Sequence, residues 1–420
     1  FFEATIPLSV TIIMTQFALY LSNVFWDIIS STQTKERIME NRADYPKILT
    51  GKTQLGPFPI EKLRRVDQIT TRIVGPIQRT DERETGFNRA IRGDFGSLAK
   101  REGDRFVLKH PIGAALRNMC AYLSPVVDGP VAAQKAPIPD DPEILSRHIK
   151  RLCYFLRADM VGICRLPQYA VYTHARDGKP IELNHQYAIV IIVDQDYGTM
   201  LGSNGRDWIS GSQSYMSYST TAFIACMVAD YIRTLGYPAR AHHARHYQVI
   251  LPPLIVLSGL GEICRLGDAV LNPFLGTRFK GAVVTTDLPL VPDKPIDFGL
   301  QDFCKKCRKC AYKCPSKAIS TGDKVIYNGY EVWTLNVERC TKFRVTNQKG
   351  SSCGVCIKVC PWNKPQGGIH DTVRWLVQHA PALNSLIVKM DDIWGYGKPD
   401  KKMKWWFDLV EENGTLKIPT

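Results

Sequence analysis

Apolar residues between about 139 and 295 follow first a helical spacing and then a strand spacing. From Pro142 to Leu156 they recur every three to four positions, which predicts a helix that begins at the proline. The run YAIVIIVD at 187–194 is apolar almost throughout, as expected for a strand whose sheet is covered on both faces.

The same alternation continues further along the chain. A second helix is predicted over 219–235, where Gly236 ends it, and a second strand over 282–286 after a glycine-rich loop. Elements that alternate in this way predict an α/β sandwich over about 139–295.

The segments before this domain differ from it in polarity. Residues 31–138 are polar and turn-rich, and are predicted to wrap over another domain. Residues 1–30 are hydrophobic, and 4–26 carry no charge and are long enough to cross a bilayer. A packed or interfacial amphipathic helix is the alternative, because 4–26 also holds hydroxyl and amide side chains. The basic residues after 4–26 would keep the rest of the chain on the cytoplasmic side, so we expect a cytoplasmic protein or one at the cytoplasmic face of the membrane.

Composition narrows the class of protein. A chain of 420 residues with 45% hydrophobic and 22% charged residues suffices for two or three globular domains. The formal charge of +14 could attract an anionic electron donor or a membrane surface, but no basic run interleaved with aromatic residues accompanies it, so no nucleic-acid partner is expected. Five cysteines are scattered and odd in number, which predicts buried free thiols in a reducing compartment. They are Cys120, Cys153, Cys164, Cys226 and Cys264.

The other eight cysteines follow the spacing of iron–sulfur ligands. They read Cys304-x2-Cys307-x2-Cys310-x3-Cys314-Pro315, then Cys340-x12-Cys353-x2-Cys356-x3-Cys360-Pro361. In bacterial ferredoxins with the first spacing, three cysteines hold one cluster and the fourth crosses to the other. We therefore expect one [4Fe–4S] cluster on Cys304, Cys307, Cys310 and Cys360, and a second on Cys314, Cys340, Cys353 and Cys356. Disulfides and structural zinc are the alternatives, but zinc sites usually take two ligands from each of two short knuckles.

Several short segments, in this order, resemble the cobalamin-dependent reductive dehalogenases over about 139–368. The segments are ADMVGI at 158–163, YAIVIIVD at 187–194, YIRTLGY at 231–237, GLGE at 259–262, GTRFK at 276–280, TDLPL at 286–290 and the two cysteine motifs. The segment RTDER at 79–83 is similar to the catabolic, oxygen-tolerant branch of that family.

The resemblance implies an α+β protein of two parts. A nitroreductase-like α/β domain over 139–295 would bind cobalamin in its base-off form, and a bacterial ferredoxin-like module over 296–368 would hold the two clusters. The chain agrees in lacking Asp-x-His-x-x-Gly, the motif by which other cobalamin proteins supply a lower histidine ligand. The tail, 369–420, is expected to pack back onto the core through Trp375, Trp394, Trp405 and Trp406.

The resemblance also implies roles for individual residues. Tyr218, at the head of the predicted helix, matches the proton donor, with Tyr215 as its rival, and Lys280 matches a cation that lowers the pKa of that tyrosine. Ser214 lies one helical turn before Tyr218, and Arg344 could bind an anionic group of the substrate. Candidates for contact with the corrin or its nucleotide tail are Gly259, Gly261, Gly276 and Arg278. The structural alternatives are a core tyrosine, a solvated lysine, ordinary turn glycines and an arginine that offsets cluster charge.

The predicted function is reductive dehalogenation of an organohalide such as a halogenated phenol. Electrons would come from an external or fused donor of the flavin/ferredoxin reductase type. An epoxyqueuosine-reductase-like enzyme acting on tRNA is the alternative, and it requires an acidic proton donor and a C-terminal tRNA-binding repeat region. A simple electron carrier is a third hypothesis, but it would leave the α/β domain without a purpose.

Overall fold

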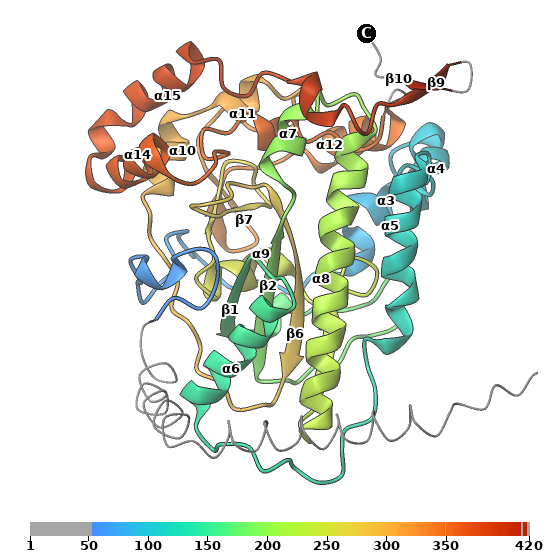
Figure 1. The fold of residues 1–420 in the computed structure, drawn as a ribbon, viewed down its shortest axis with the longest axis vertical. Helices are drawn as coiled ribbons and strands as arrows, with labels where there is room; N and C mark the ends of the chain where they lie inside the picture. The colour runs from blue at the N-terminus through green and yellow to red at the C-terminus, as the bar shows by residue number, and fades with distance from the viewer. Residues whose placement is uncertain (1–52, 349, 413–414, 418–420) are drawn as a thin grey trace, which may run out of the picture. The chain divides into compact units, whose positions relative to one another are not determined.

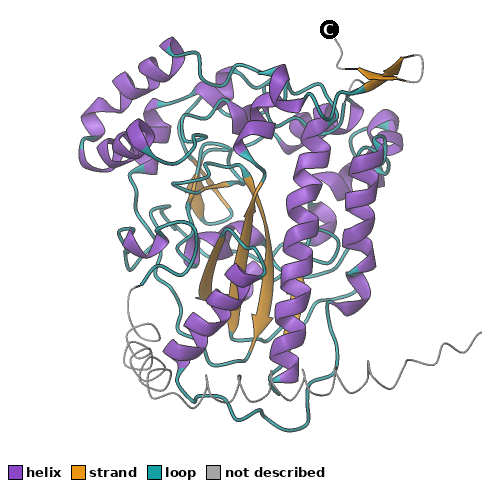
Figure 2. Ribbon diagram, viewed as in Figure 1, coloured by secondary structure: helices purple, strands orange, loops and turns teal. Residues whose placement is uncertain are grey.

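A four-stranded antiparallel sheet lies at the core of the computed structural model, which describes residues 53–348, 350–412 and 415–417 (Figures 1 and 2). Its strand order is β1-β2-β6-β3. The strands are β1 (Met160–Arg165), β2 (Tyr187–Asp194), β3 (Ala239–His242) and β6 (Phe279–Thr286). The strand predicted at 187–194 is confirmed. The strand predicted at 282–286 begins earlier, at Phe279, so Lys280 belongs to the sheet and not to the loop before it.

Both faces of the sheet are covered, as the apolar sequence of β2 predicts. Ile189 and Ile191 pack with α6 (Pro142–Phe155) and α8 (Ile209–Thr234). Val190 and Ile192 point to the opposite face and pack with α9 (Leu251–Leu257). Side chains alternate across a strand, so a sheet with helices on both sides needs apolar residues at every position.

The helix predicted from Pro142 is confirmed as α6, where the Asp141 side chain accepts hydrogen bonds from the backbone N–H groups of Glu143 and Ile144. The second predicted helix begins ten residues too late: α8 starts at Ile209, not at 219. Its first turns are rich in serine and lack an apolar stripe, so helical periodicity could not reveal them. Gly236, with φ of 86°, follows its C-terminus as predicted.

The described part of 31–138 contributes three helices and three short 3-10 turns. They are η1 (Ile60–Lys62), η2 (Glu82–Glu84), α3 (Gly86–Arg92), α4 (Ser97–Gly103), α5 (Pro111–Tyr122) and η3 (Ser124–Val126). Helices α3 and α4 pack on α12 (Val337–Thr346), and α5 runs beside α8 (Figure 1). This region therefore contacts both the sheet domain and the cysteine-rich region.

Shorter elements complete the sheet domain and the cysteine-rich region. Before the cysteines they are η4 (Gln168–Ala170), α7 (Tyr197–Gly202), β4 (Glu262–Ile263) and β5 (Val270–Leu271). Among the cysteines they are α10 (Leu300–Lys306), α11 (Lys309–Tyr312), β7 (Val325–Tyr327), β8 (Tyr330–Val332) and α13 (Val355–Lys358).

The tail packs back through both apolar and charged residues, and its Val377 is buried in the apolar cluster that also holds most of the cysteines. Its elements are α14 (Gly368–His379), η5 (Pro381–Leu383), α15 (Asn384–Ile393), η6 (Lys401–Lys404), β9 (Val410–Glu412) and β10 (Thr415–Lys417). Asp391 on α15 is buried and forms ion pairs with Lys309 and Lys364. The four tryptophans predicted to pack onto the core, Trp375, Trp394, Trp405 and Trp406, are 45–55% exposed, so they are only about half covered.

Two further predictions concern thiols and the membrane. The five scattered cysteines are buried and free, as predicted. The segment 4–26 lies outside the described residues. Within the part of the chain that the structure describes, no helix has the length and apolar character needed to cross a membrane.

Candidate functional site

The eight predicted ligand cysteines gather where α10, α11, α12 and α13 meet. Cys304 lies on α10, Cys310 on α11, Cys340 on α12 and Cys356 on α13. Most of them belong to one apolar cluster that also holds Phe298, Phe303 and Trp362. Residues far apart in sequence are thereby brought to one place.

The thiols fall into two neighbourhoods. Burial raises the pKa of Cys310, and the nearby thiols of Cys360, Cys304, Cys356 and Cys307 raise it further. Burial likewise raises the pKa of Cys356, with further increases from Cys353, Cys340 and Cys314. These neighbourhoods coincide with the two predicted ligand sets, and Cys356 lies close enough to Cys310 to connect them. The assignment of each cysteine to its cluster stays a prediction.

The donor set suits iron–sulfur clusters better than a single ion. Within the described ranges, no three His, Cys, Asp or Glu side chains converge as the ligands of one metal ion do. A [4Fe–4S] cluster is held by four thiolates on its separate iron corners, so its ligands can stand farther apart.

The second cysteine loop lies directly against the start of α8. Ser210 Oγ donates a hydrogen bond of 2.9 Å to the backbone carbonyl of Cys353. Gly211 is required at the next position, because a Cβ atom there would overlap the Ser351 side chain. The polar first turns of α8 therefore position the loop that carries Cys353 and Cys356.

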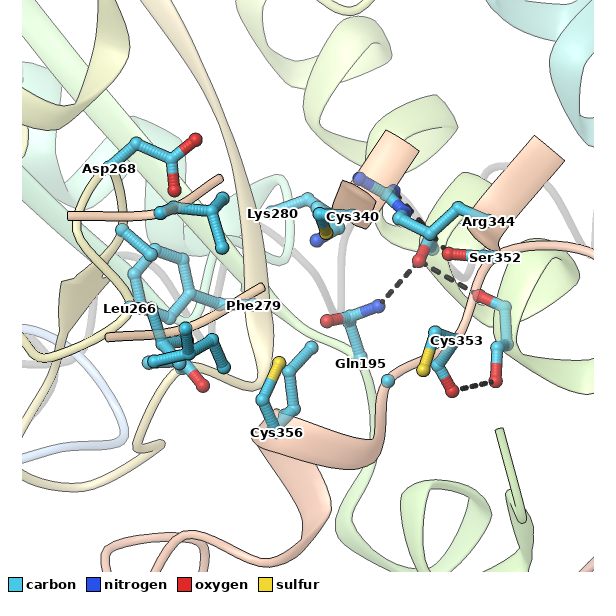
Figure 3. A pocket seen from close by; sticks show the side chains of 18 of the residues that line it. Gln195, Leu266, Asp268, Phe279, Lys280, Cys340, Arg344, Ser352, Cys353 and Cys356 are labelled. Atoms are coloured by element: carbon cyan, nitrogen blue, oxygen red, sulfur yellow. Dashed lines mark hydrogen bonds between the residues drawn. The ribbon is translucent and has the colours of Figure 1, made fainter. Parts of the chain in front are cut away.

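A cavity of about 300 Å3 lies between this loop, α8 and β6 (Figure 3). We call it the inner cavity. Figure 3 shows Lys280 near its middle, with Asp268 to one side and Arg344 to the other. Its polar wall includes Gln195, Ser214, Tyr218, Asp268, Thr277, Lys280, Arg344, Ser352, Cys314, Cys340, Cys353 and Cys356. The predicted ligands of one cluster thus share a cavity with the predicted catalytic pair.

Tyr218 and Lys280 are adjacent. The Nζ atom of Lys280 lies 5.6 Å from the centroid of the Tyr218 ring, over its face. Burial lowers the pKa of Lys280 to about 8, with a further decrease caused by Arg344. Burial raises the pKa of Tyr218 to about 12; Tyr215 adds to this increase and Arg344 opposes it. The predicted decrease in the tyrosine pKa is therefore not found, because burial outweighs the neighbouring cations.

A second cavity, of about 660 Å3, is also lined by Tyr218, and we call it the outer cavity. Ser214, Tyr218, Arg344 and Ser352 line both cavities, whereas Tyr215 lines only the outer one. Arg344 Nη2 donates a hydrogen bond to Ser352 Oγ at 3.4 Å, and its guanidinium group lies over the Phe87 ring. These shared residues form the wall between the cavities. Tyr218 itself stands ten residues inside α8 and not at its head.

The four predicted corrin contacts lie elsewhere. Gly259 packs against Arg65, Gly261 against β5, and Gly276 against the backbone of Trp362 and Asn363. Arg278 is buried in an ion pair with Asp194 at 2.7 Å. Neighbours of Gly276 and Arg278 line the inner cavity instead, namely Thr277 and Phe279.

Several wall residues were missed at the sequence level. Gln195 follows β2, Thr277 precedes β6, and Asp268 lies in the turn between β4 and β5. Gln195 Oε1 and Thr277 Oγ1 are buried and have no hydrogen-bond partner within the described residues. No periodic pattern or spacing rule marks such positions, because the fold alone brings them to the cavity.

The fold and the site define an iron–sulfur protein in which a tyrosine and a lysine share a cavity with cluster ligands. Comparison with known families agrees, since residues 303–364 match the 4Fe-4S dicluster domain.

Individual known proteins are similar to this chain over most of its length. The tetrachloroethene reductive dehalogenase of Sulfurospirillum multivorans is 32% identical over 325 residues, which is 68% of this chain and 64% of that protein. The solved structure of the catabolic reductive dehalogenase NpRdhA with 3-bromo-4-hydroxybenzoic acid matches with a TM-score of 0.82 and 45% identity, over 88% of this chain and 54% of that one. A reductive dehalogenase structure described in terms of B12-dependent dehalogenation matches equally well. This chain is a homologue of the reductive dehalogenases over most of its length, and the predicted resemblance is confirmed. It spans between about half and two thirds of the length of these relatives.

Proposed function

We propose that this chain is the cobalamin- and cluster-binding part of a reductive dehalogenase that replaces halogen by hydrogen on an aromatic organohalide. The observation that carries the proposal is the inner cavity, where cluster ligands and the Tyr218–Lys280 pair face each other. Electron delivery and proton delivery would therefore converge in one cavity. The 45% identity to NpRdhA, against 32% to the tetrachloroethene enzyme, favours the catabolic branch and an aromatic substrate.

The residues that line the inner cavity have the chemistry that contact with a corrinoid requires. A corrin ring is apolar on its faces and carries primary amides around its edge. Leu266, Val270 and Phe279 offer apolar contact, and the unpaired Gln195 Oε1 and Thr277 Oγ1 could accept hydrogen bonds from such amides. No histidine occurs among the described residues that line this cavity, in keeping with the base-off form. When bound, cobalamin supplies a strongly reducing cobalt centre that cleaves the carbon–halogen bond.

On this proposal the central sheet with α6, α8 and α9 is the nitroreductase-like corrinoid domain, and the cysteine-rich region is the ferredoxin-like module. The domain bounds given above remain predictions. A flavin- or ferredoxin-type donor would supply electrons from the cytoplasmic side.

The protein's own part in the chemistry is to supply one proton. Overall, an organohalide, two electrons and one proton give the hydrogen-substituted product and a halide ion. The Tyr218 hydroxyl is protonated at neutral pH, since its pKa is about 12, and its ring lies in the wall that faces both cavities. Lys280 and Arg344 would stabilise the phenolate that remains, and solvent would reprotonate it.

Asp268 is the alternative proton donor. It is the acid that lines the inner cavity. An acidic donor is also what the epoxyqueuosine-reductase hypothesis requires. Asp268→Asn and Tyr218→Phe should therefore be compared in the same assay, where loss of activity in the aspartate variant alone would favour the alternative.

Anaerobic reconstitution tests the proposal. The protein, loaded with iron and sulfide, should retain hydroxocobalamin through gel filtration at about one corrinoid per chain, as a specific site requires. With a low-potential chemical reductant it should release bromide from bromophenols. Protein that holds both clusters but takes up no corrinoid would overturn the proposal.

A further inference from the structure

The outer cavity combines aromatic walls with an excess of arginine. Its aromatic side chains come from α3, the loop after α4, α8 and the loops around the sheet: Phe87, Phe106, Tyr172, Tyr215, Tyr218 and Tyr247. Its charged lining consists of Arg83, Arg92, Arg117, Arg176, Arg245, Arg344, Glu82 and Asp104. At about 660 Å3 it is far larger than a two-carbon haloalkene requires and falls within the range of sites for drug-sized ligands.

Half of these arginines already have acidic partners. Arg83 pairs with Asp81 at 2.6 Å, and Arg92 pairs with Asp94 at 2.6 Å. Arg176 pairs with Glu82 at 2.5 Å. Their charges are largely neutralised inside the protein, so they have less capacity to attract a ligand.

Arg117 on α5 and Arg245 in the loop after β3 differ from these arginines in their ion pairing. Among the described residues, neither has a carboxylate within ion-pair distance, and neither guanidinium has a hydrogen-bond partner. Burial lowers the pKa of Arg245, and the nearby charges of Arg117 and Arg176 lower it further. Two partly buried guanidinium groups that repel each other are costly unless an anion binds between them.

This basic pair is separate from Arg344. Burial raises the pKa of Tyr215, and the charges of Arg117 and Arg245 both oppose this increase. The charge of Arg344 instead lowers the pKa of Tyr218, Lys280 and Cys340. The rings of Tyr215 and Tyr218 are in edge contact, 5.6 Å apart at their centroids. The lining of the outer cavity therefore holds Arg344 near Tyr218, and Arg117 and Arg245 near Tyr215, together with aromatic side chains.

We propose that Arg117 and Arg245 bind a carboxylate of the substrate, so that the organohalide is a halogenated aromatic acid and not a neutral haloalkene. This inference rests on the proposed function and assigns its substrate class. Arginine suits this task because its planar group binds a carboxylate through two hydrogen bonds and stays charged at every accessible pH. The halogen-bearing end of the ring would then point toward Tyr218 and Arg344. The phosphate of the cobalamin nucleotide tail is the other anion that could occupy the pair.

Equilibrium binding tests the carboxylate site without turnover. Protein loaded with clusters and cobalamin would be titrated calorimetrically with 4-hydroxybenzoate and with phenol, which differ only in the carboxylate. Arg117→Gln and Arg245→Gln should each weaken the binding of 4-hydroxybenzoate about tenfold or more, which is the usual effect of losing a charged hydrogen bond. Neither substitution should change the affinity for phenol. Arg92→Gln is the matched control, since Arg92 lines the same cavity but is already paired, and it should change neither affinity by more than about twofold.

Halide release provides a second comparison. The rate constant kcat/KM for 3-bromo-4-hydroxybenzoate should fall in the Arg117 and Arg245 variants, while that for 2-bromophenol should not. An equal loss for both bromophenols, or an unchanged affinity for 4-hydroxybenzoate, would overturn the inference. Weaker retention of cobalamin, with unchanged retention of cobinamide, would also overturn it by assigning the pair to the nucleotide phosphate.

The two proposals fail in different ways. If no organohalide releases halide, the proposed function fails, whereas the carboxylate site fails only when acid and phenol are no longer distinguished. Thermal unfolding separates a structural role from a binding role. An unpaired arginine that awaits a ligand should be replaceable without loss of Tm, so a marked decrease in Tm for Arg245→Gln would count against the inference.

Discussion

The amine of Lys280 lies over the face of the Tyr218 ring, 5.6 Å from its centroid, and does not approach the ring in the plane of the hydroxyl. β6 supplies the lysine and α8 the tyrosine, so the contact depends on the packing of that helix on the sheet. A cation in this position favours negative charge that develops in the ring.

Removal of the Tyr218 hydroxyl should abolish most of the activity. We expect Tyr218→Phe to lower the rate of halide release by about 100-fold or more, the usual contribution of a general acid. Corrinoid and iron content should be unchanged, because Tyr218 is not among the predicted ligands. Tyr215→Phe is the control and should change the rate only a few-fold, since Tyr215 does not line the inner cavity. Full activity in Tyr218→Phe would assign the proton donor elsewhere.

The rate should depend on the charge of Lys280. Its pKa is lowered to about 8, so it is charged at neutral pH and loses its proton as the pH rises through about 8. Tyr218, with a pKa of about 12, stays protonated over the same range. We therefore expect kcat/KM to fall above about pH 8. Lys280→Arg should keep its rate to higher pH, because arginine does not lose its proton there. The same alkaline decrease in that variant would remove Lys280 from the mechanism.

Cysteines from distant motifs should share a cluster. Cys360→Ala and Cys304→Ala should lose the same electron paramagnetic resonance signal, and Cys314→Ala should lose the signal that Cys356→Ala loses. Each variant should contain about four fewer iron atoms per chain. If Cys360→Ala behaves like Cys356→Ala, the predicted sharing of ligands is incorrect.

The stability of the packed tail should depend on the buried carboxylate of Asp391. Asp391 pairs with Lys309 at 2.5 Å and with Lys364 at 2.7 Å, and all three side chains are at least 90% buried. Asp391→Asn would leave two buried ammonium groups with less compensation, at a cost of about 3 kcal/mol or more in the free energy of unfolding. Asp392→Asn is the control: Asp392 contacts the same Lys309 but is 58% exposed, so its loss should cost about 1 kcal/mol or less. Equal Tm values for the two variants would show that burial of the Asp391 ion pairs adds little to stability.

The sequence predicts those features that depend on neighbours along the chain. The cysteine spacing, the start of α6 at Pro142 and the strand at 187–194 are all local patterns. The start of α8 was missed because its polar residues face the cysteine loop and two cavities instead of an apolar core. Arg117 and Arg245 were missed for another reason: they are single arginines in different segments, and only the tertiary fold brings them together. The tail tryptophans are only about half covered, since a large apolar residue need not be fully buried.

The residues that line both cavities lie between two linings with different parts in the proposed function. The lining of the outer cavity, which would select the substrate, stands on α3, α5, α8 and surface loops, whereas the predicted cluster ligands stand on the cysteine loops. On that function, substitutions on α3 and α5 would redirect the range of organohalides accepted without altering the reduction potentials of the clusters. A mutant library confined to these two helices would then be the rational starting point for redirecting the protein toward new halogenated contaminants.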